Sequence, residues 1–252
     1  MGESSPAVQP RGFGATSRTD AWWIGPLATA LGLGAFVVYS TARAIANTHY
    51  EHDNLLSPFF SPNLTHALGL PNWISPAFLI LWAPGGFRLT CYYYRKAYYR
   101  AFFADPPACA VGEARKEYCG ESKFPFILQN LHRYFLYFAI VILFILWYDV
   151  WQALWFNGKL GVSVGTLVLG ANSLFLTLYT LSCHSLRHLV GGRVDCFSCV
   201  ALGGARHSAW KGLSRLNEHH MLWAWVSLFG VGFADFYVWM VASGTFRDMR
   251  IL

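Results

Sequence analysis

The sequence contains five apolar stretches, each close to 20 residues long. A helix of about 20 residues is long enough to cross the roughly 30 Å hydrocarbon core of a bilayer. The composition agrees, because 55% of the residues are hydrophobic and only 13% are charged, which is more apolar than a soluble domain requires. We therefore predict an all-α integral membrane bundle of five transmembrane helices. The predicted spans are Ala21 to Ala42, Trp73 to Tyr94, Leu131 to Trp151, Val162 to Ser185 and Met221 to Ala242.

The chain divides into a short tail and one membrane domain. Residues 1–20 are polar and rich in Gly, Ser and Pro, which predicts a mobile tail on the cytoplasmic side. Residues 21–252 form the predicted five-helix membrane-anchor domain, and no internal repeat stands out in them. The tail lacks the basic start of a signal peptide, and the apolar run behind it is too long for one. We therefore do not expect this region to be a cleaved signal.

The cationic side chains indicate how the bundle lies in the membrane. The net charge of +6 does not indicate nucleic-acid binding, because the cations lie in short segments between apolar runs. Most of them precede the first span, or lie between the second and third or the fourth and fifth spans. Cytoplasmic connections carry the excess of Lys and Arg. We predict a multi-pass protein of the cell's inner (plasma) membrane, with its N-terminus in the cytoplasm and its C-terminus outside.

Thiol and imidazole side chains gather at the predicted cytoplasmic ends of four spans. Taken singly, a buried Cys behaves as a small hydrophobe, and a His at a helix end can reach the interface. Taken together, ionisable groups at this depth are costly unless they are paired or bound to something. We therefore expect a redox or metal centre in this layer. The candidate ligands are Cys91, His132, Cys183, His184, His188 and His220.

Ligand chemistry leaves two kinds of centre open. Two histidines on facing helices can hold the iron of haem b by its axial positions. Two thiolates on one iron and two imidazoles on the other hold a Rieske-type 2Fe-2S cluster, whose potential suits exchange with quinones. Because the layer offers both ligand types, we expect the cluster, with haem b as the alternative. The thiolates would be Cys91 and Cys183, and the imidazoles two among His132, His184, His188 and His220.

A second pair of cysteines has the C-x-x-C spacing. Cys196 and Cys199 could chelate a metal, exchange disulfides or serve as free structural thiols. Cys109 and Cys119 are too far apart for this pattern. On the cytoplasmic side we expect both sets to be reduced unless they bind metal. The C-x-x-C pair leaves open a membrane thiol/disulfide oxidoreductase coupled to quinone, although that function gives the histidines no role.

Polar residues inside the spans suggest one further function class. Arg88, Asn172 and Asp235 could line the path of a transporter. The ionisable groups of the chain, however, concentrate at one interface instead of crossing the midplane of the bilayer. This distribution disfavours a transporter.

Four strings in the sequence carry a family resemblance. They are "TCYYYRKAYYR", "FPFILQNLHRYF", "SCHSLRH" and "LSRLNEHHMLWAW". In this order, they resemble the membrane-anchor (cytochrome b-type, C) subunit of actinobacterial succinate dehydrogenase/fumarate reductase complexes. The resemblance implies a chain that holds a flavoprotein subunit and an iron–sulfur subunit on the cytoplasmic face and passes their electrons to quinone, in an assembly that could form a higher oligomer. Many such anchors bind haem b, but His49, His52 and His66 all lie in the outer connection, so a distal haem is not expected.

The stretch that begins at Cys91 also suggests where quinone binds. Three tyrosines and several cations follow the thiol, and they would lie between the centre and the cytoplasm. An aromatic belt with positive-inside anchors explains most of these residues, but it does not explain the thiol. We therefore predict a quinone pocket at the cytoplasmic interface, in contact with membrane lipid. Its residues would be Tyr94, Arg95, Arg133 and Ser185.

Overall fold

Four helices in the described part of the chain are long and apolar enough to cross a membrane. The computed structural model describes residues 12–114, 124, 126–156 and 158–252. The protein is mostly helical, as predicted. Two parts of the sequence analysis, residues 1–11 of the predicted tail and Cys119, lie outside the described residues. The four long helices are α1 (Ile24–Ala46), α6 (His132–Gln152, preceded by the 3-10 helix η3, Phe126–Leu131), α7 (Val164–Leu181) and α10 (His220–Ala242).

The second predicted span, Trp73 to Tyr94, is not one continuous helix. It is divided into α3 (Pro76–Ile80), α4 (Trp82–Leu89) and α5 (Tyr92–Tyr98), and α5 continues into the π-helix η1 (Tyr99–Phe103). Pro84 lacks the N–H that would bond to the carbonyl of Ile80, so the helical ladder lapses between α3 and α4. The count of five long spanning helices is therefore not confirmed.

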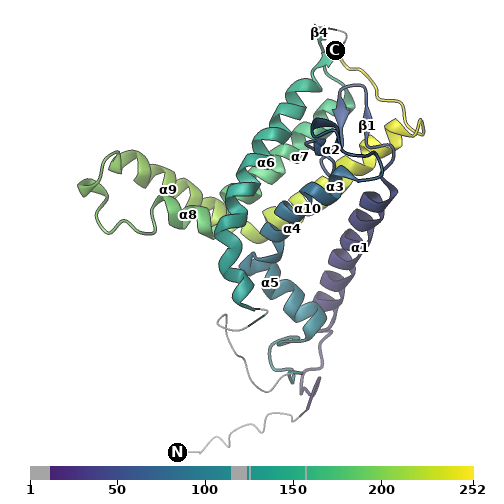
Figure 1. Ribbon diagram of the computed structural model, residues 1–252. Helices are drawn as coiled ribbons and strands as arrows, with labels where there is room; N and C mark the ends of the chain where they lie inside the picture. Colours follow the sequence, from purple (N-terminus) through teal and green to yellow (C-terminus); the bar gives the residue numbers. More distant parts are fainter. Residues whose placement is uncertain (1–11, 115–123, 125, 157) are drawn as a thin grey trace, which may run out of the picture.

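Helices α4, α6, α7 and α10 pack side by side, and α1 leans on α10 (Figure 1). Helices α4 and α6 can approach closely at Gly86 because glycine has no Cβ atom. A Cβ atom built there would lie only 2.2 Å from the Phe135 ring. Large apolar side chains also cover the outside of the bundle, where Phe144 is 73% exposed and Val38 is 70% exposed. Such an outer surface suits contact with lipid.

Short hairpins and loops close the end of the bundle at which the chain terminates (Figure 1). The antiparallel strands β1 (Glu51–His52) and β2 (Leu55–Leu56) precede the short helix α2 (Leu64–Ala67). Strands β3 (Trp155–Phe156) and β4 (Lys159–Leu160) connect α6 to α7, and Ser163 pairs with Arg250 near the chain end. A capping box between Ser163 and Thr166 begins α7. We call this the C-terminal end.

The opposite end of the bundle carries α5 and the region after it, and we call it the α5 end. Part of the predicted tail is hydrogen-bonded there. Gly14 donates its backbone N–H to Gly112, and the Thr16 hydroxyl donates to the carbonyl of Ala110. Residues 12–20 thus contact the loop after η1, whereas the mobility of the tail stays a prediction.

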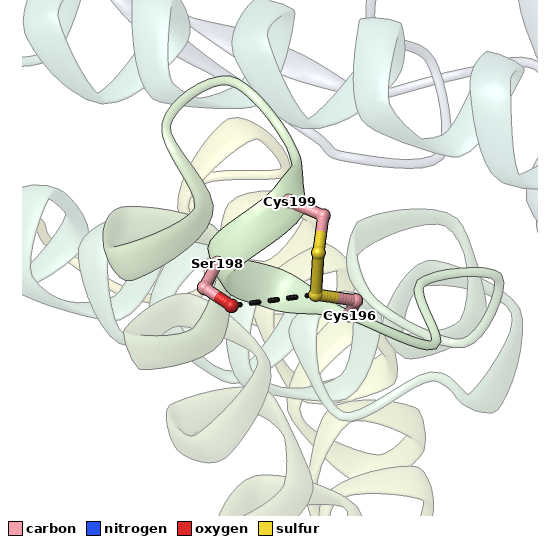
Figure 2. The surroundings of a disulfide bond; sticks show 3 residues. All are labelled: Cys196, Ser198 and Cys199. Atoms are coloured by element: carbon pink, nitrogen blue, oxygen red, sulfur yellow. Dashed lines mark hydrogen bonds between the residues drawn. A yellow bond between two sulfur atoms is a disulfide. The ribbon is translucent and has the colours of Figure 1, made fainter.

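Helices α8 (His184–Val190) and α9 (Gly203–Glu218) form an arm that projects from the side of the bundle (Figure 1). The Arg187 guanidinium fixes α8 to α9, because it donates to the Ser214 hydroxyl at 2.8 Å and lies 5.1 Å from the centre of a Trp210 ring. In the loop of the arm, Cys196 and Cys199 form a disulfide around the 3-10 helix η4 (Phe197–Cys199) (Figure 2).

The expectation that Cys196 and Cys199 are reduced is therefore wrong. The short helical turn between them brings their Cα atoms to 5.3 Å. This separation lies within the range of about 4.4–6.8 Å in which a disulfide forms without backbone movement. The pair is thus not available as a metal ligand in this arrangement.

Candidate metal centre and quinone groove

A five-residue pattern occurs twice, once at the end of each of two bundle helices. The segment "FRLTC", Phe87 to Cys91, ends α4, and the segment "YTLSC", Tyr179 to Cys183, ends α7. Both cysteines are extended, with φ and ψ of −67° and 131° at Cys91 and −65° and 132° at Cys183. Each one starts a seven-residue helix, α5 or α8. The chain therefore contains a short internal repeat that the sequence analysis missed.

A histidine at the first position of the next long helix completes each half of the repeat. His132 begins α6 and His220 begins α10. The two halves cross over, because the thiol of each half contacts the imidazole of the other. The Cys91 Sγ lies 3.3 Å from His220 Nε2, and the Cys183 Sγ lies 3.2 Å from His132 Nε2. We call these four side chains the Cys/His layer.

Hydroxyl groups beside the cysteines fix the tautomer of both imidazoles. Thr90 donates its hydroxyl proton to the carbonyl of Gly86, and Ser182 donates to that of Tyr179. Each hydroxyl oxygen can then only accept from an imidazole, and Thr90 lies 3.1 Å from His132 Nδ1 while Ser182 lies 2.7 Å from His220 Nδ1. We therefore assign the proton to both Nδ1 atoms. The Nε2 lone pairs are left facing the thiols, as metal ligation requires.

Aromatic rings of the same repeat hold the imidazoles in place. Phe87 stacks on His132 with ring centres 4.7 Å apart, and Tyr179 stacks on His220 at 5.1 Å. Cys91, Cys183 and Tyr179 are 3%, 1% and 1% exposed. Both thiols and the His132 imidazole are therefore held away from solvent, whereas His220 is partly exposed. Fixed orientation of this kind is what a metal centre needs from the residues around its ligands.

The four donors of the layer are not arranged as a ready single-metal site. No three His, Cys, Asp or Glu side chains converge on one point among the described residues. A structural single-metal site requires about four ligands around one point. Two thiols and two imidazoles are the ligand types of a Rieske-type cluster, but such a cluster binds two thiolates on one iron and two imidazoles on the other, whereas here each thiol faces an imidazole.

The other two candidate histidines lie in a groove next to the layer. His184 and His188 line it together with Tyr92, Arg133 and Ser185, and its volume is about 540 Å³. The Arg133 guanidinium lies 3.3 Å from His188 Nδ1. Because the sequence analysis predicts a quinone pocket among these residues, we call this the quinone groove. Because His132 also lines it, one imidazole belongs to both the layer and the groove.

The remaining predicted quinone residues lie elsewhere. Tyr94 is 3% exposed, and its hydroxyl donates to the carbonyl of Ala224 at 2.6 Å. It also accepts from Arg88 at 2.6 Å, so its polar atom serves the packing of α4, α5 and α10. Arg95 lies on the ring of Tyr92, 5.0 Å from its centre. The groove thus brings Arg133 and Ser185 together with Tyr92, the first residue of the turn that the sequence analysis expected beside the quinone.

The residues proposed for a transport path are engaged separately. Arg88 donates to the Ser227 hydroxyl at 3.0 Å. Asp235 forms a buried ion pair with Arg43 at the C-terminal end. Asn172 is 2% exposed on α7. Arg88 and Asp235 thus bind separate partners at different depths of the bundle, and they do not form a common path.

Comparison with known proteins identifies the family. A family model described as actinobacterial succinate dehydrogenase subunit SdhC matches residues 24–244. Among solved structures, the chain is similar to one described as "Mycobacterium smegmatis Sdh1 complex in the apo form". The two share 44% identity over 98% of each chain, with a TM-score of 0.87. No match among curated proteins was found. The chain therefore belongs to the family of actinobacterial succinate dehydrogenase membrane subunits, SdhC.

Proposed function

We propose that this chain anchors the flavoprotein and iron–sulfur subunits of a succinate dehydrogenase complex in the membrane and carries their electrons to quinone. The family match and the likeness to a chain of the Sdh1 complex support the assembly. We further propose that the Cys/His layer holds a Rieske-type 2Fe-2S cluster. The observation that carries this proposal is the gathering of two thiols and two imidazoles from four segments in one layer, and binding would require each thiol to turn from the imidazole that it now contacts.

The residues of the layer have distinct roles in this proposal. Cys91 and Cys183 would bind as thiolates, and each has to release its proton when iron binds. Thr90 and Ser182 accept the Nδ1 protons, which keeps the Nε2 atoms unprotonated and turned toward the metal. Leu136 and Leu228, 0% and 2% exposed, pack around the layer and exclude water. When bound, a cluster of this type supplies one-electron transfer at a potential suited to quinones.

The quinone groove is suited to a ligand with carbonyl oxygens. The Arg133 guanidinium and the Ser185 hydroxyl both line it, and each can donate to such an oxygen. The Tyr92 ring offers a flat apolar wall. Because His132 lines the groove while its Nε2 contacts Cys183, its imidazole would lie between a bound centre and a bound quinone.

We also propose that the segment from α3 to α5 crosses the membrane as a broken helix. Cys91, between α4 and α5, contacts His220 at the start of α10, so the segment reaches the same depth as a long spanning helix. Lys and Arg near the α5 end would lie in the cytoplasm. Reporter fusions after Gly203 should report cytoplasm, and fusions after His52 or at Leu252 should report the outside. A cytoplasmic signal at Leu252 would contradict this topology.

The centre can be tested by electron paramagnetic resonance with iron and acid-labile sulfide analysis of the purified complex. We expect Cys91→Ser and Cys183→Ser each to abolish a Rieske-type signal, because a hydroxyl does not replace a thiolate ligand. The clusters of the partner subunit should remain. Cys109→Ser is the matched control, because this free thiol is exposed and outside the layer. A haem optical band without acid-labile sulfide in this subunit would instead favour haem b held by His132 and His220.

The groove can be tested separately from the centre. We expect Arg133→Gln to lower quinone reduction by about tenfold or more, because hydrogen bonds to charged groups contribute about 1.5–3 kcal/mol. Dye-coupled succinate oxidation and the signal of the centre should persist. Arg193→Gln, on the exposed loop after α8, is the control for loss of a positive charge. Unchanged quinone kinetics in Arg133→Gln would place the quinone elsewhere.

A further inference from the structure

A second pocket lies at the root of the arm, where α8 passes into the loop before α9. We call it the arm pocket, and its volume is about 270 Å³. Two imidazoles, one guanidinium and two aromatic rings line it, and they belong to His184, His188, Arg187, Phe197 and Trp210. No carboxylate lines it among the residues that the structure describes. The pocket therefore offers hydrogen-bond donors and positive charge, which suit an anion.

The Arg187 guanidinium is held in position but keeps donors to spare. Its Nε donates to the Ser214 hydroxyl at 2.8 Å, and its flat group lies 5.1 Å from the centre of a Trp210 ring. Within the described part of the chain, Arg187 forms no ion pair, and its two terminal nitrogens donate to no acceptor. These nitrogens form a planar fork of N–H groups, which matches the oxygens of a phosphate.

His188 supplies a further donor. Its Nδ1 lies 3.3 Å from the Arg133 guanidinium, which can only donate, so Nδ1 accepts and we assign the proton of the neutral imidazole to Nε2. Gly191 lets the turn after α8 pass close to the aromatic wall, because a Cβ atom built there would lie 2.5 Å from the Trp210 ring. The donors and the aromatic wall thus belong to one compact pocket.

The place of the pocket indicates the source of the anion. Helix α8 begins directly after Cys183, close to the end of the spanning helix α7, and the arm projects from the side of the bundle (Figure 1). Spanning helices end at the level of the lipid headgroups. Both histidines of the arm pocket also line the quinone groove, and so does Tyr134 of α6. Tyr134, Tyr137 and Val141 are exposed on one face of α6, which suits contact with an acyl chain.

We propose that the arm pocket binds the phosphate group of an anionic phospholipid, with an acyl chain along the exposed face of α6. Basic pockets beside spanning helices are suited to lipid headgroups. Lys211 and Arg215 are exposed on α9 and can attract an anionic membrane surface, although they do not line the pocket. The proposal does not depend on the Cys/His layer, because none of the donors in the pocket requires a metal.

The test is native mass spectrometry of the assembled complex titrated with phosphatidylglycerol. We expect Arg187→Gln to weaken binding of one lipid molecule by about tenfold or more, because hydrogen bonds to a charged group are lost. Arg193→Gln is the matched control, because it removes the same charge from the adjoining exposed loop without lining the pocket. Ser214→Ala releases the guanidinium from α9 but keeps its charge, so we expect it to retain most of the binding.

Three comparisons decide the outcome. Equal weakening in Arg187→Gln and Arg193→Gln would reduce the effect to general attraction between charges and overturn the pocket. Equal weakening in Arg187→Gln and Ser214→Ala would make Arg187 a structural residue of the arm and overturn it as well. Loss of the partner subunits from Arg187→Gln, with lipid binding unchanged, would assign the pocket to an acidic segment of a partner instead.

Inorganic phosphate separates the two sources of a phosphate group. We expect it to displace phosphatidylglycerol only at a large excess, because it makes no contact with the exposed face of α6. Phosphatidylcholine, which carries a phosphate but no net charge, should bind more weakly than phosphatidylglycerol. Displacement of the lipid by an equal concentration of inorganic phosphate would overturn the lipid as the ligand.

Discussion

The two ends of the bundle bury polar groups in opposite ways. At the C-terminal end, Asp235 is 0% exposed and accepts from Arg43 at 2.9 Å, from Tyr39 at 2.5 Å and from Ser57 at 2.5 Å. Arg43 also donates to the carbonyl of Thr48 and lies 4.9 Å from the centre of a Trp239 ring. At the α5 end, the Cys/His layer contains neutral thiols and imidazoles with ligand lone pairs turned inward.

The difference separates a structural site from a ligand site. The carboxylate and guanidinium at the C-terminal end neutralise each other and form their hydrogen bonds within the chain. No bound ligand is needed to stabilise these buried charges. The Cys/His layer pairs two weak donors with two strong acceptors. Thiol to imidazole bonds leave most of the coordinating capacity of these four side chains unused. Burial of a polar residue in a membrane helix is therefore not in itself a sign of a functional site.

The largest expected effect follows from breaking the ion pair. Asp235→Leu should lower the free energy of unfolding by about 3–5 kcal/mol, because it leaves Arg43 as an unpaired buried charge. Thermal or denaturant unfolding of the complex in detergent measures this effect. The paired variant Arg43→Met with Asp235→Leu should recover much of the loss. The signal of the centre should be unchanged in any complex that assembles.

A double variant that is less stable than Asp235→Leu alone would contradict the structural assignment. Loss of quinone reduction in the double variant at normal stability would do so as well. In either case the C-terminal end would have a function beyond packing.

A smaller effect is expected from the hydroxyl groups that orient the imidazoles. Thr90→Ala and Ser182→Ala leave every direct ligand in place, but they remove the acceptors of the Nδ1 protons. Outer-shell changes of this type typically cost about 10–100-fold in metal affinity. We expect lower iron occupancy of the centre after treatment with a chelator, with little change in unfolding temperature.

Ser40→Ala provides the comparison for this pair. The Ser40 hydroxyl also donates to a backbone carbonyl, that of Val37, yet it lies on α1 outside the Cys/His layer. Equal iron retention in Ser182→Ala and Ser40→Ala would show that the hydroxyl groups do not position the ligands.

The composition of the Cys/His layer could be predicted from the sequence, but the choice of histidines could not. Hydropathy gives the depth of a residue in a span, and depth alone placed Cys91, Cys183 and four histidines at one level. Selecting His132 and His220 depends on which helix faces the thiols. The repeated aromatic, hydroxyl and Cys pattern was visible in the sequence and points to Phe87 and Tyr179 as well. It was missed because the repeat is only five residues long.

The broken second span and the C-terminal ion pair were harder to predict. Hydropathy over Trp73 to Tyr94 does not reveal that the helix is interrupted, although Pro84 is a signal for such an interruption. Arg43 follows the predicted end of the first span at Ala42, and the sequence analysis gave it no role. Only the contact of α1 with α10 shows that it meets Asp235. Which side chains of distant helices meet depends on how the helices pack. A local pattern in a single sequence does not reveal that packing.

The smallest effect is expected at the disulfide in the arm. Cys196 and Cys199 enclose a very short loop. A disulfide stabilises by removing entropy from the unfolded chain, and it removes less for a shorter loop, so the contribution to stability is limited to about 2 kcal/mol. That contribution concerns the fold of the arm, because Phe197 between them packs on His207 and Trp210 of α9. Changing both cysteines to Ser should therefore leave the signal of the centre, quinone reduction and the unfolding of the bundle unaltered. Limited proteolysis should detect faster cleavage within the arm. Loss of quinone reduction in this variant, with the centre intact, would revive the thiol/disulfide oxidoreductase as a function of the chain, and it would make the arm and the Cys/His layer two redox sites instead of one.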